Sequence, residues 1–115
     1  MEIRVITPQE ITSFRAERGW TQAKLAERLR VGTRAVQEWE GGRRSVPLML
    51  GLVLHHIRMI EELEHQVRMM RDGSITLRQG NTDITPASLK QAEGVIADYE
   101  RLIGNHVWGE DVPAK

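Results

Sequence analysis

The segment from Thr21 to Arg44 constrains the fold more than any other part of the 115-residue chain. Its pattern predicts two short helices joined by a tight turn. Thr21 is a favourable N-cap for the first helix, because its hydroxyl can accept a hydrogen bond from a backbone N–H of the first turn. The residues expected on the inner side of this helix are Ala23, Leu25, Ala26 and Leu29.

The second helix of the pair is predicted to begin at Gly32 or Thr33 and to end at the pair Gly41-Gly42. Val36 and Trp39 are three residues apart and would both face inward. Too few residues separate the two helices for anything but a tight connection. This arrangement is that of a helix-turn-helix.

The residue types of this segment agree with a known family at fixed offsets. They are Thr21-Gln22, Leu25-Ala26-Glu27, Val31, Val36, Trp39-Glu40 and Gly42-Arg43. Through them, the region from about Ile11 to Leu54 resembles the DNA-binding domain of the Cro and lambda-repressor family, the XRE type. The resemblance implies a repressor-like helix-turn-helix domain of four to five helices. Beyond Leu54 no family is recognised.

Composition limits the remaining possibilities. The chain is long enough for one domain with an appendage, and its 40% of hydrophobic residues can form a modest core. It has no cysteine, so a disulfide framework and a thiolate metal site are both excluded. The N-terminus lacks the apolar run of a signal peptide, and no stretch has membrane-spanning length. We therefore expect a soluble, cytoplasmic protein without a membrane partner.

The net charge of zero conceals an asymmetry along the chain. Residues 1–60 hold 10 Lys/Arg and 6 Asp/Glu, whereas residues 61–115 hold 6 and 10, giving +4 and −4. A basic first part joined to an acidic remainder suits a protein that binds nucleic acid through one face only.

A first helix is predicted before this motif. Thr7, Pro8 and Glu10 form a capping box with proline at the first helical position, so a helix should run from Pro8 to about Arg18 and end at Gly19.

A long helix is predicted from about residue 47 to Arg71, where Asp72-Gly73 supplies a stop. It carries an apolar stripe that its own C-terminal helix or a second subunit must cover. We favour a mixture that leans toward the dimer, because the remaining chain looks too short to cover the whole stripe. The expected dimer contacts are Leu50, Val53, Ile57, Ile60, Leu63, Val67 and Met70.

The last part of the chain changes character. Residues 74–84 alternate as in a short strand or hairpin, with an ordered loop as the alternative. Thr85-Pro86 repeats the earlier start signal, so a helix is predicted over 86–103. The predicted fold is thus mainly α, with a helix-turn-helix domain over 1–54 and a dimerisation region over 55–115.

The resemblance implies four base-contacting residues on the outer side of the second helix of the motif: Thr33, Arg34, Gln37 and Glu38. Arg34 is the strongest candidate, because its guanidinium matches O6 and N7 of guanine. The alternative is that Arg34 and Glu38, four residues apart, only pair with each other on the helix surface.

Phosphate contacts are expected at the ends of the helices. Gln22 resembles the phosphate-clamping glutamine of the family, at a helix N-terminus whose dipole favours anions. Two arginines after the Gly-Gly pair would hold the backbone on the other side, unless they belong only to a solvated loop. The expected phosphate contacts are Thr21, Gln22, Arg15, Arg43 and Arg44.

Arg15 and Glu40 occupy matching positions of the family, and we predict a structural salt bridge between them. Two residues depart from the family pattern. Arg30 stands where glycine is common, and a left-handed backbone there would cost about 1 kcal/mol or more. Gly41 stands where asparagine often contacts phosphate. These departures indicate an altered turn and a backbone anchor that is missing or shifted to Arg43.

Enzymatic readings have little support. The four histidines do not form a metal-ligand spacing, and no glycine-rich loop follows a strand. We therefore expect no catalytic residues, no metal and no cofactor.

These observations predict a sequence-specific regulator of double-stranded DNA, most often a repressor of its own operon from a phage, plasmid or bacterium. It would act as a homodimer on an inverted-repeat operator. Antitoxin-like and anti-CRISPR-associated types stay open. The alternatives are an antitoxin or adaptor whose C-terminal half binds a protein partner such as a toxin, and an RNA-binding regulator.

Overall fold

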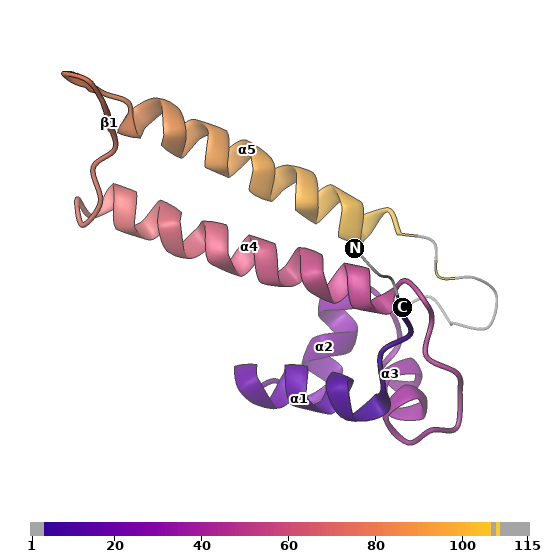
Figure 1. Ribbon diagram of the computed structural model, residues 1–115. Coiled ribbons are helices and arrows are strands. Elements are labelled where there is room, and N and C mark those ends of the chain that lie inside the picture. Colours follow the sequence, from indigo (N-terminus) through magenta and orange to yellow (C-terminus); the bar gives the residue numbers. More distant parts are fainter. Residues whose placement is uncertain (1–3, 107, 109–115) are drawn as a thin grey trace. The chain divides into compact units, whose positions relative to one another are not determined.

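The computed structural model describes residues 4–106 and 108 of the chain (Figure 1). The described residues therefore omit 1–3 of the predicted region 1–54, and 107 and 109–115 of the predicted region 55–115. The elements are α1 (Pro8–Arg18), α2 (Gln22–Leu29), α3 (Thr33–Glu40), α4 (Leu50–Arg71), β1 (Arg78–Gln79), β2 (Thr82–Asp83) and α5 (Thr85–Gly104). The predicted fold class, mainly α with a short hairpin, is confirmed.

The chain divides into two compact units. One comprises the residues up to Leu54 together with those from Ile103 onward, and the other comprises His55–Leu102. Helix α4 begins in the first unit and continues into the second. Among the described residues, no helix is long and apolar enough to cross a membrane.

Helix α1 forms as its capping signals predict. The Thr7 hydroxyl accepts a hydrogen bond from the Glu10 N–H, and the Glu10 carboxylate accepts one from the Thr7 N–H, which completes the capping box. Gly19 ends the helix in the left-handed region, with φ 67°. Ile11 and Phe14 are buried on its inner side.

The turn between α2 and α3 keeps its left-handed geometry although it lacks glycine. Arg30 adopts φ 61° and ψ 40°, and the Val31 N–H donates to the Ala26 carbonyl at 3.0 Å. The altered turn expected from Arg30 was therefore wrong, because the hydrogen bonds that close α2 hold the strained residue in place.

The core of the first unit is built as the motif predicts, with one exception. Trp39 is fully buried, and Trp20 packs edge-on against Phe14 with ring centroids 6.0 Å apart. Ala23, expected on the inner side of α2, is exposed. The buried hydrophobic residues of helices α1 to α3 and the turn are Ile11, Phe14, Leu25, Ala26, Leu29, Val31, Ala35, Val36 and Trp39.

The second unit is an antiparallel helical hairpin. His56 of α4 lies against Tyr99 of α5 with ring centroids 5.3 Å apart, and toward the other end Arg71 pairs with Glu93 at 2.5 Å. Between the helices, β1 and β2 pair in antiparallel register around a turn in which Gly80 has φ 62°. Figure 1 shows this hairpin at the end of the α4–α5 pair.

The bounds of α4 and of the hairpin strands differ from the predicted ones. Helix α4 begins at Leu50 and not at about residue 47, because a turn closed by the Leu50 N–H and the Pro47 carbonyl precedes it. The strands cover only residues 78–79 and 82–83 of the predicted 74–84.

Thr85 does not act as an N-cap for α5, which was the reading of the Thr-Pro signal. Its hydroxyl instead accepts a hydrogen bond from the Leu77 N–H at 2.8 Å, across the base of the β-hairpin. The Asp83 carboxylate accepts from the Thr85 N–H at 2.9 Å and supplies the turn that starts the helix.

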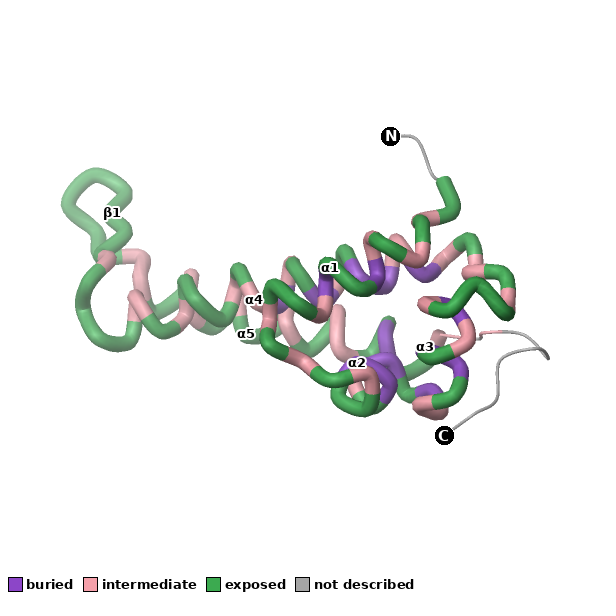
Figure 2. The backbone as a smooth tube through the Cα atoms, turned by 90° about the horizontal axis from the view of Figure 1, so that it is seen from below, coloured by how far each residue is buried: buried purple, intermediate pink, exposed green. Residues whose placement is uncertain are grey.

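The apolar stripe of α4 is covered unevenly. Its N-terminal members are buried within the protomer, at most 1% exposed, so they do not present the dimer surface that was expected of them: Leu50, Val53, Ile57 and Ile60. The part of the chain after α4 was expected to be too short to cover the stripe, but it forms a helix, α5, of 20 residues against the 22 of α4. The remaining three are only half-buried: Leu63, Val67 and Met70. Figure 2 shows buried positions in the helix-turn-helix and none near the β-hairpin.

Strain at Arg30 leads to a prediction about stability. Arg30→Gly should raise the free energy of unfolding by up to about 1 kcal/mol, because glycine adopts the left-handed region without a Cβ clash. Glu27→Gly, at an exposed position inside α2, should lower it by about 1 kcal/mol. Urea unfolding of both variants tests this. Equal destabilisation by the two substitutions would show that Arg30 carries no backbone strain.

Candidate nucleic-acid interface

The outer side of α3 presents the four residues expected to face bases. Arg34 and Gln37 are exposed, whereas Thr33 and Glu38 are half-buried. Arg34, Gln37 and Glu38 line a shallow depression of about 480 Å³ together with Arg43. Because Ala35, Val36 and Trp39 lock the inner side of the helix, these polar side chains are held on a fixed outer surface.

Glu38 is paired with two arginines. Its Oε1 accepts from Arg34 Nε at 2.7 Å, and its Oε2 lies 2.8 Å from Arg44 Nε. The hydrogen bond from Arg34 holds the pKa of the Glu38 carboxyl below its usual range. The surface pair that was the alternative to base contact by Arg34 is therefore present, but the Arg34 side chain is still 83% exposed.

Backbone hydrogen bonds fix the positions of both arginines in the loop after α3. The Arg43 and Arg44 N–H groups donate to the Glu38 carbonyl at 2.9 Å and 3.3 Å, and Gly42 adopts φ 72°. Gly41 donates its N–H to the Gln37 carbonyl at 2.9 Å. An anchoring side chain is absent at position 41, while Arg43 lines the same depression as Arg34, Gln37 and Glu38.

Glu40, on the opposite side of α3, gathers residues from two other helices. Arg15 of α1 donates from Nε and from one terminal nitrogen to the two Glu40 oxygens, both at 2.7 Å, which confirms the predicted salt bridge. Thr12 donates to the same carboxylate at 3.0 Å and Gln22 of α2 at 3.4 Å. Burial raises the pKa of Glu40, but the hydrogen bonds from Arg15 and Thr12 outweigh it and leave the pKa below its usual value.

The expected phosphate contacts thus fall into two groups. Arg15 and Gln22 converge on Glu40, next to Thr21, whose hydroxyl caps α2 by accepting from the Lys24 N–H at 3.0 Å. Arg43 and Arg44 lie in the loop at the other end of α3.

Sequence reasoning missed several contacts of this site, among them those of Thr12 and Arg44. Thr12 lies one helical turn before Arg15, so a shared partner was visible from the spacing. The pairing of Arg44 with Glu38 had no such signal, because it depends on the conformation of the loop.

Two short helices joined by a tight left-handed turn, the second with a polar outer side, form the arrangement of a helix-turn-helix. Residues 11–49 match the family model for helix-turn-helix domains. This segment is therefore a helix-turn-helix of the XRE type, similar to that of Cro and lambda repressor, and in general terms it supports a DNA-binding regulator. The match ends at Met49, directly before α4. Neither the curated proteins nor the solved structures gave a significant match.

The Arg15–Glu40 pair yields a second stability prediction. Arg15→Ala and Glu40→Ala should each lower the free energy of unfolding more than the double substitution does, because each single change leaves a partly buried charge without its partner. The coupling energy in a double-mutant cycle should be about 1.5–3 kcal/mol.

The ion pair between Arg4 and Glu10 serves as the control, because its side chains are 60% and 39% exposed. Its coupling should be much smaller. Purely additive losses at Arg15 and Glu40 would remove the structural role of this pair.

Proposed function

We propose that this chain is a sequence-specific regulator that binds double-stranded DNA as a homodimer. It would act as a repressor of its own operon in a phage, plasmid or bacterium. The observation that carries the proposal is the outer side of α3. There Arg34 is 83% exposed beside Gln37 and Arg43, on a helix whose inner side is immobilised in the core.

The chemistry of these residues suits the major groove, which admits an α-helix. Arg34 can donate two hydrogen bonds to O6 and N7 of guanine. Gln37 can pair with N6 and N7 of adenine, and Thr33 can contact a thymine methyl group.

Phosphate contacts would flank this helix. Arg43 and Arg44 follow α3 directly, and Thr21 and Gln22 stand at the N-terminus of α2, where backbone amides attract anions. Arg15, whose side chain is 18% exposed, would contribute mainly by holding Glu40.

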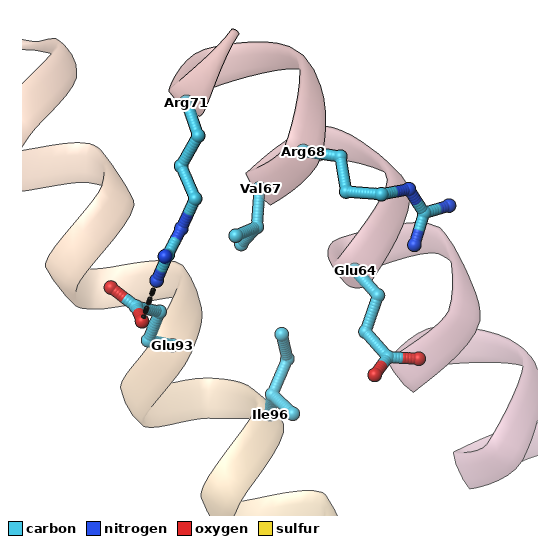
Figure 3. Close-up of a pocket in the computed structure, with 6 residues that line it drawn as sticks. All are labelled: Glu64, Val67, Arg68, Arg71, Glu93 and Ile96. Carbon is cyan, nitrogen blue, oxygen red and sulfur yellow. Dashed lines mark hydrogen bonds and ion pairs between the residues drawn. The ribbon is translucent and has the colours of Figure 1, made fainter.

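A homodimer is supported by the incomplete packing of the second unit. No residue from Glu61 to Leu102 is buried. Val67 of α4 and Ile96 of α5 point toward each other in a groove of about 410 Å³ (Figure 3). Two helices alone cannot enclose the apolar residues of this groove, whereas a second helical pair can.

The charges around the groove favour a second copy as the partner. Its remaining lining residues are Glu64, Arg68, Arg71 and Glu93, two acidic and two basic. A two-fold axis brings the same surface against itself, so a rim with both signs can be complementary to its own copy. The resulting pair of reading helices would require an inverted-repeat operator, with half-sites about 34 Å apart by default.

Selection from random duplex DNA tests the regulator proposal. The wild-type protein should select an inverted repeat, and Arg34→Ala should lose about 1–3 kcal/mol of discrimination at one base pair of each half-site. Arg43→Ala is the matched control and should weaken binding to all sequences while reducing the salt slope by about 1.

Two results would count against this proposal. Equal weakening on every sequence by Arg34→Ala would make Arg34 a phosphate contact. The absence of any selected motif for the wild-type protein would overturn sequence-specific binding.

The dimer proposal predicts that a charged side chain in the groove between α4 and α5 prevents dimerisation. Val67→Glu should convert the dimer to a monomer in analytical ultracentrifugation, because a carboxylate cannot be buried there without a partner. Operator affinity should fall about 100-fold or more with the loss of the second reading helix. Ala97→Glu, the control, adds the same charge at an exposed position of α5 and should leave a dimer.

A monomeric wild-type protein would contradict the homodimer. It would favour the alternative in which a different protein covers the groove.

A further inference from the structure

We propose that Glu38 does not read a base and is instead a positioning residue that aims Arg34 at a guanine and holds Arg44 toward the phosphate backbone. This inference rests on the proposed function. It assigns to Glu38 a role different from that of a base acceptor, which its place on α3 implied.

The first argument is that both Glu38 oxygens are already engaged. Oε1 is 2.7 Å from Arg34 Nε and Oε2 is 2.8 Å from Arg44 Nε. Each oxygen retains a second acceptor site, but a cytosine amino group would have to share that oxygen with a charge-assisted hydrogen bond, which is about twice as strong as a bond between neutral groups. The two arginines, and not a base, therefore set the orientation of the carboxylate.

Exposure supplies the second argument. The Glu38 side chain is 16% exposed, whereas that of Arg34 is 83% exposed. The Arg34 side chain is therefore accessible to a duplex that approaches α3, whereas most of the Glu38 side chain is covered. A covered side chain is better placed to support its exposed neighbour than to reach a base edge itself.

The third argument concerns which Arg34 atoms are used. Glu38 accepts from Nε, so the two terminal amino groups remain as the fork that would meet O6 and N7 of guanine. Fixing Nε restricts the rotation of a long side chain before DNA arrives. Less side-chain entropy is then lost on binding, which favours the guanine contact.

Glu38 also ties base reading to backbone contact. Its second oxygen holds Arg44, and its backbone carbonyl accepts the N–H groups of Arg43 and Arg44. One residue thus sets the direction of the base-reading arginine and the position of the loop that carries the phosphate-binding arginines. With two arginines around one carboxylate, the cluster keeps a net charge of +1, which suits a surface facing DNA.

Specificity profiles of single and double variants test the inference. The wild-type motif is determined first by selection, so that a failure of the proposed function is seen separately. We expect Glu38→Ala to flatten the preference at the same base pair as Arg34→Ala, by up to the about 5- to 150-fold that one bidentate contact provides. Arg34→Ala combined with Glu38→Ala should behave like Arg34→Ala alone.

A second readout separates positioning from a purely structural role. Glu38→Ala removes a negative charge from the DNA-facing side, so affinity for non-cognate DNA at low salt should rise while the cognate preference falls. Glu38→Gln retains one acceptor oxygen for Arg34 and should recover part of the guanine preference. Because Glu38→Gln is nearly isosteric, it also keeps the test decisive if Glu38→Ala unfolds the domain, which thermal unfolding would reveal.

Gln37→Ala is the matched control, because it should relax a different base pair and add to Arg34→Ala. Additive loss by Glu38→Ala at its own base pair would show that Glu38 reads a base and would overturn the inference. Unchanged preferences in Glu38→Ala would overturn it as well. If the wild-type protein selects no motif, the proposed function fails and the positioning role fails with it.

Discussion

The bidentate ion pair between Arg15 and Glu40 is the interaction on which the orientation of α3 depends. Glu40 is the last residue of α3, and its carboxylate receives hydrogen bonds from Arg15 and Thr12 of α1 and from Gln22 of α2. One carboxylate therefore joins three helices, and its oxygens are only 2.7 Å from the Arg15 nitrogens. A helix of only eight residues, Thr33–Glu40, would be marginal by itself, so these contacts and the buried Trp39 fix its direction.

The two glutamates of α3 form ion pairs on different sides of the helix, Glu40 on the inner side and Glu38 on the outer side. Successive helix positions are about 100° apart, so Glu38 and Glu40 point to nearly opposite sides of the helix. Glu40 faces α1 and α2, whereas Glu38 faces Arg34 and Arg44 on the outer surface. In both cases neighbouring arginines hold the glutamate pKa low, so both carboxylates keep their charge and their bonding geometry near neutral pH. The first carboxylate orients the helix, and the second is proposed to orient what the helix carries.

Most of the local structure was predictable because its causes are local. The capping box of Thr7 and Glu10, the Thr21 cap and the stop at Gly19 depend on residues within a few positions of each other. The Thr85 signal was misread for a related reason. The same hydroxyl can bind either its own helix or a neighbouring backbone, and the Leu77 N–H, brought close by the hairpin, took it. The proposed DNA contacts had a basis in the family resemblance, but the pairing of Glu38 with Arg44 did not.

The sequence alone determined the helix-turn-helix, its position in the chain and the polar residues on the outer side of α3, because capping residues set where a short helix begins and ends and residue spacing sets which side is apolar. Only the tertiary structure decided how far the stripe of α4 is covered, since burial depends on what packs against it: Ile57 and Ile60 are enclosed, while Leu63 and Val67 are half-buried. Only the tertiary structure decided that Arg30 keeps a left-handed turn without glycine. It likewise decided that Glu38 is engaged by two arginines, because the loop that returns Arg44 to α3 is closed by backbone hydrogen bonds.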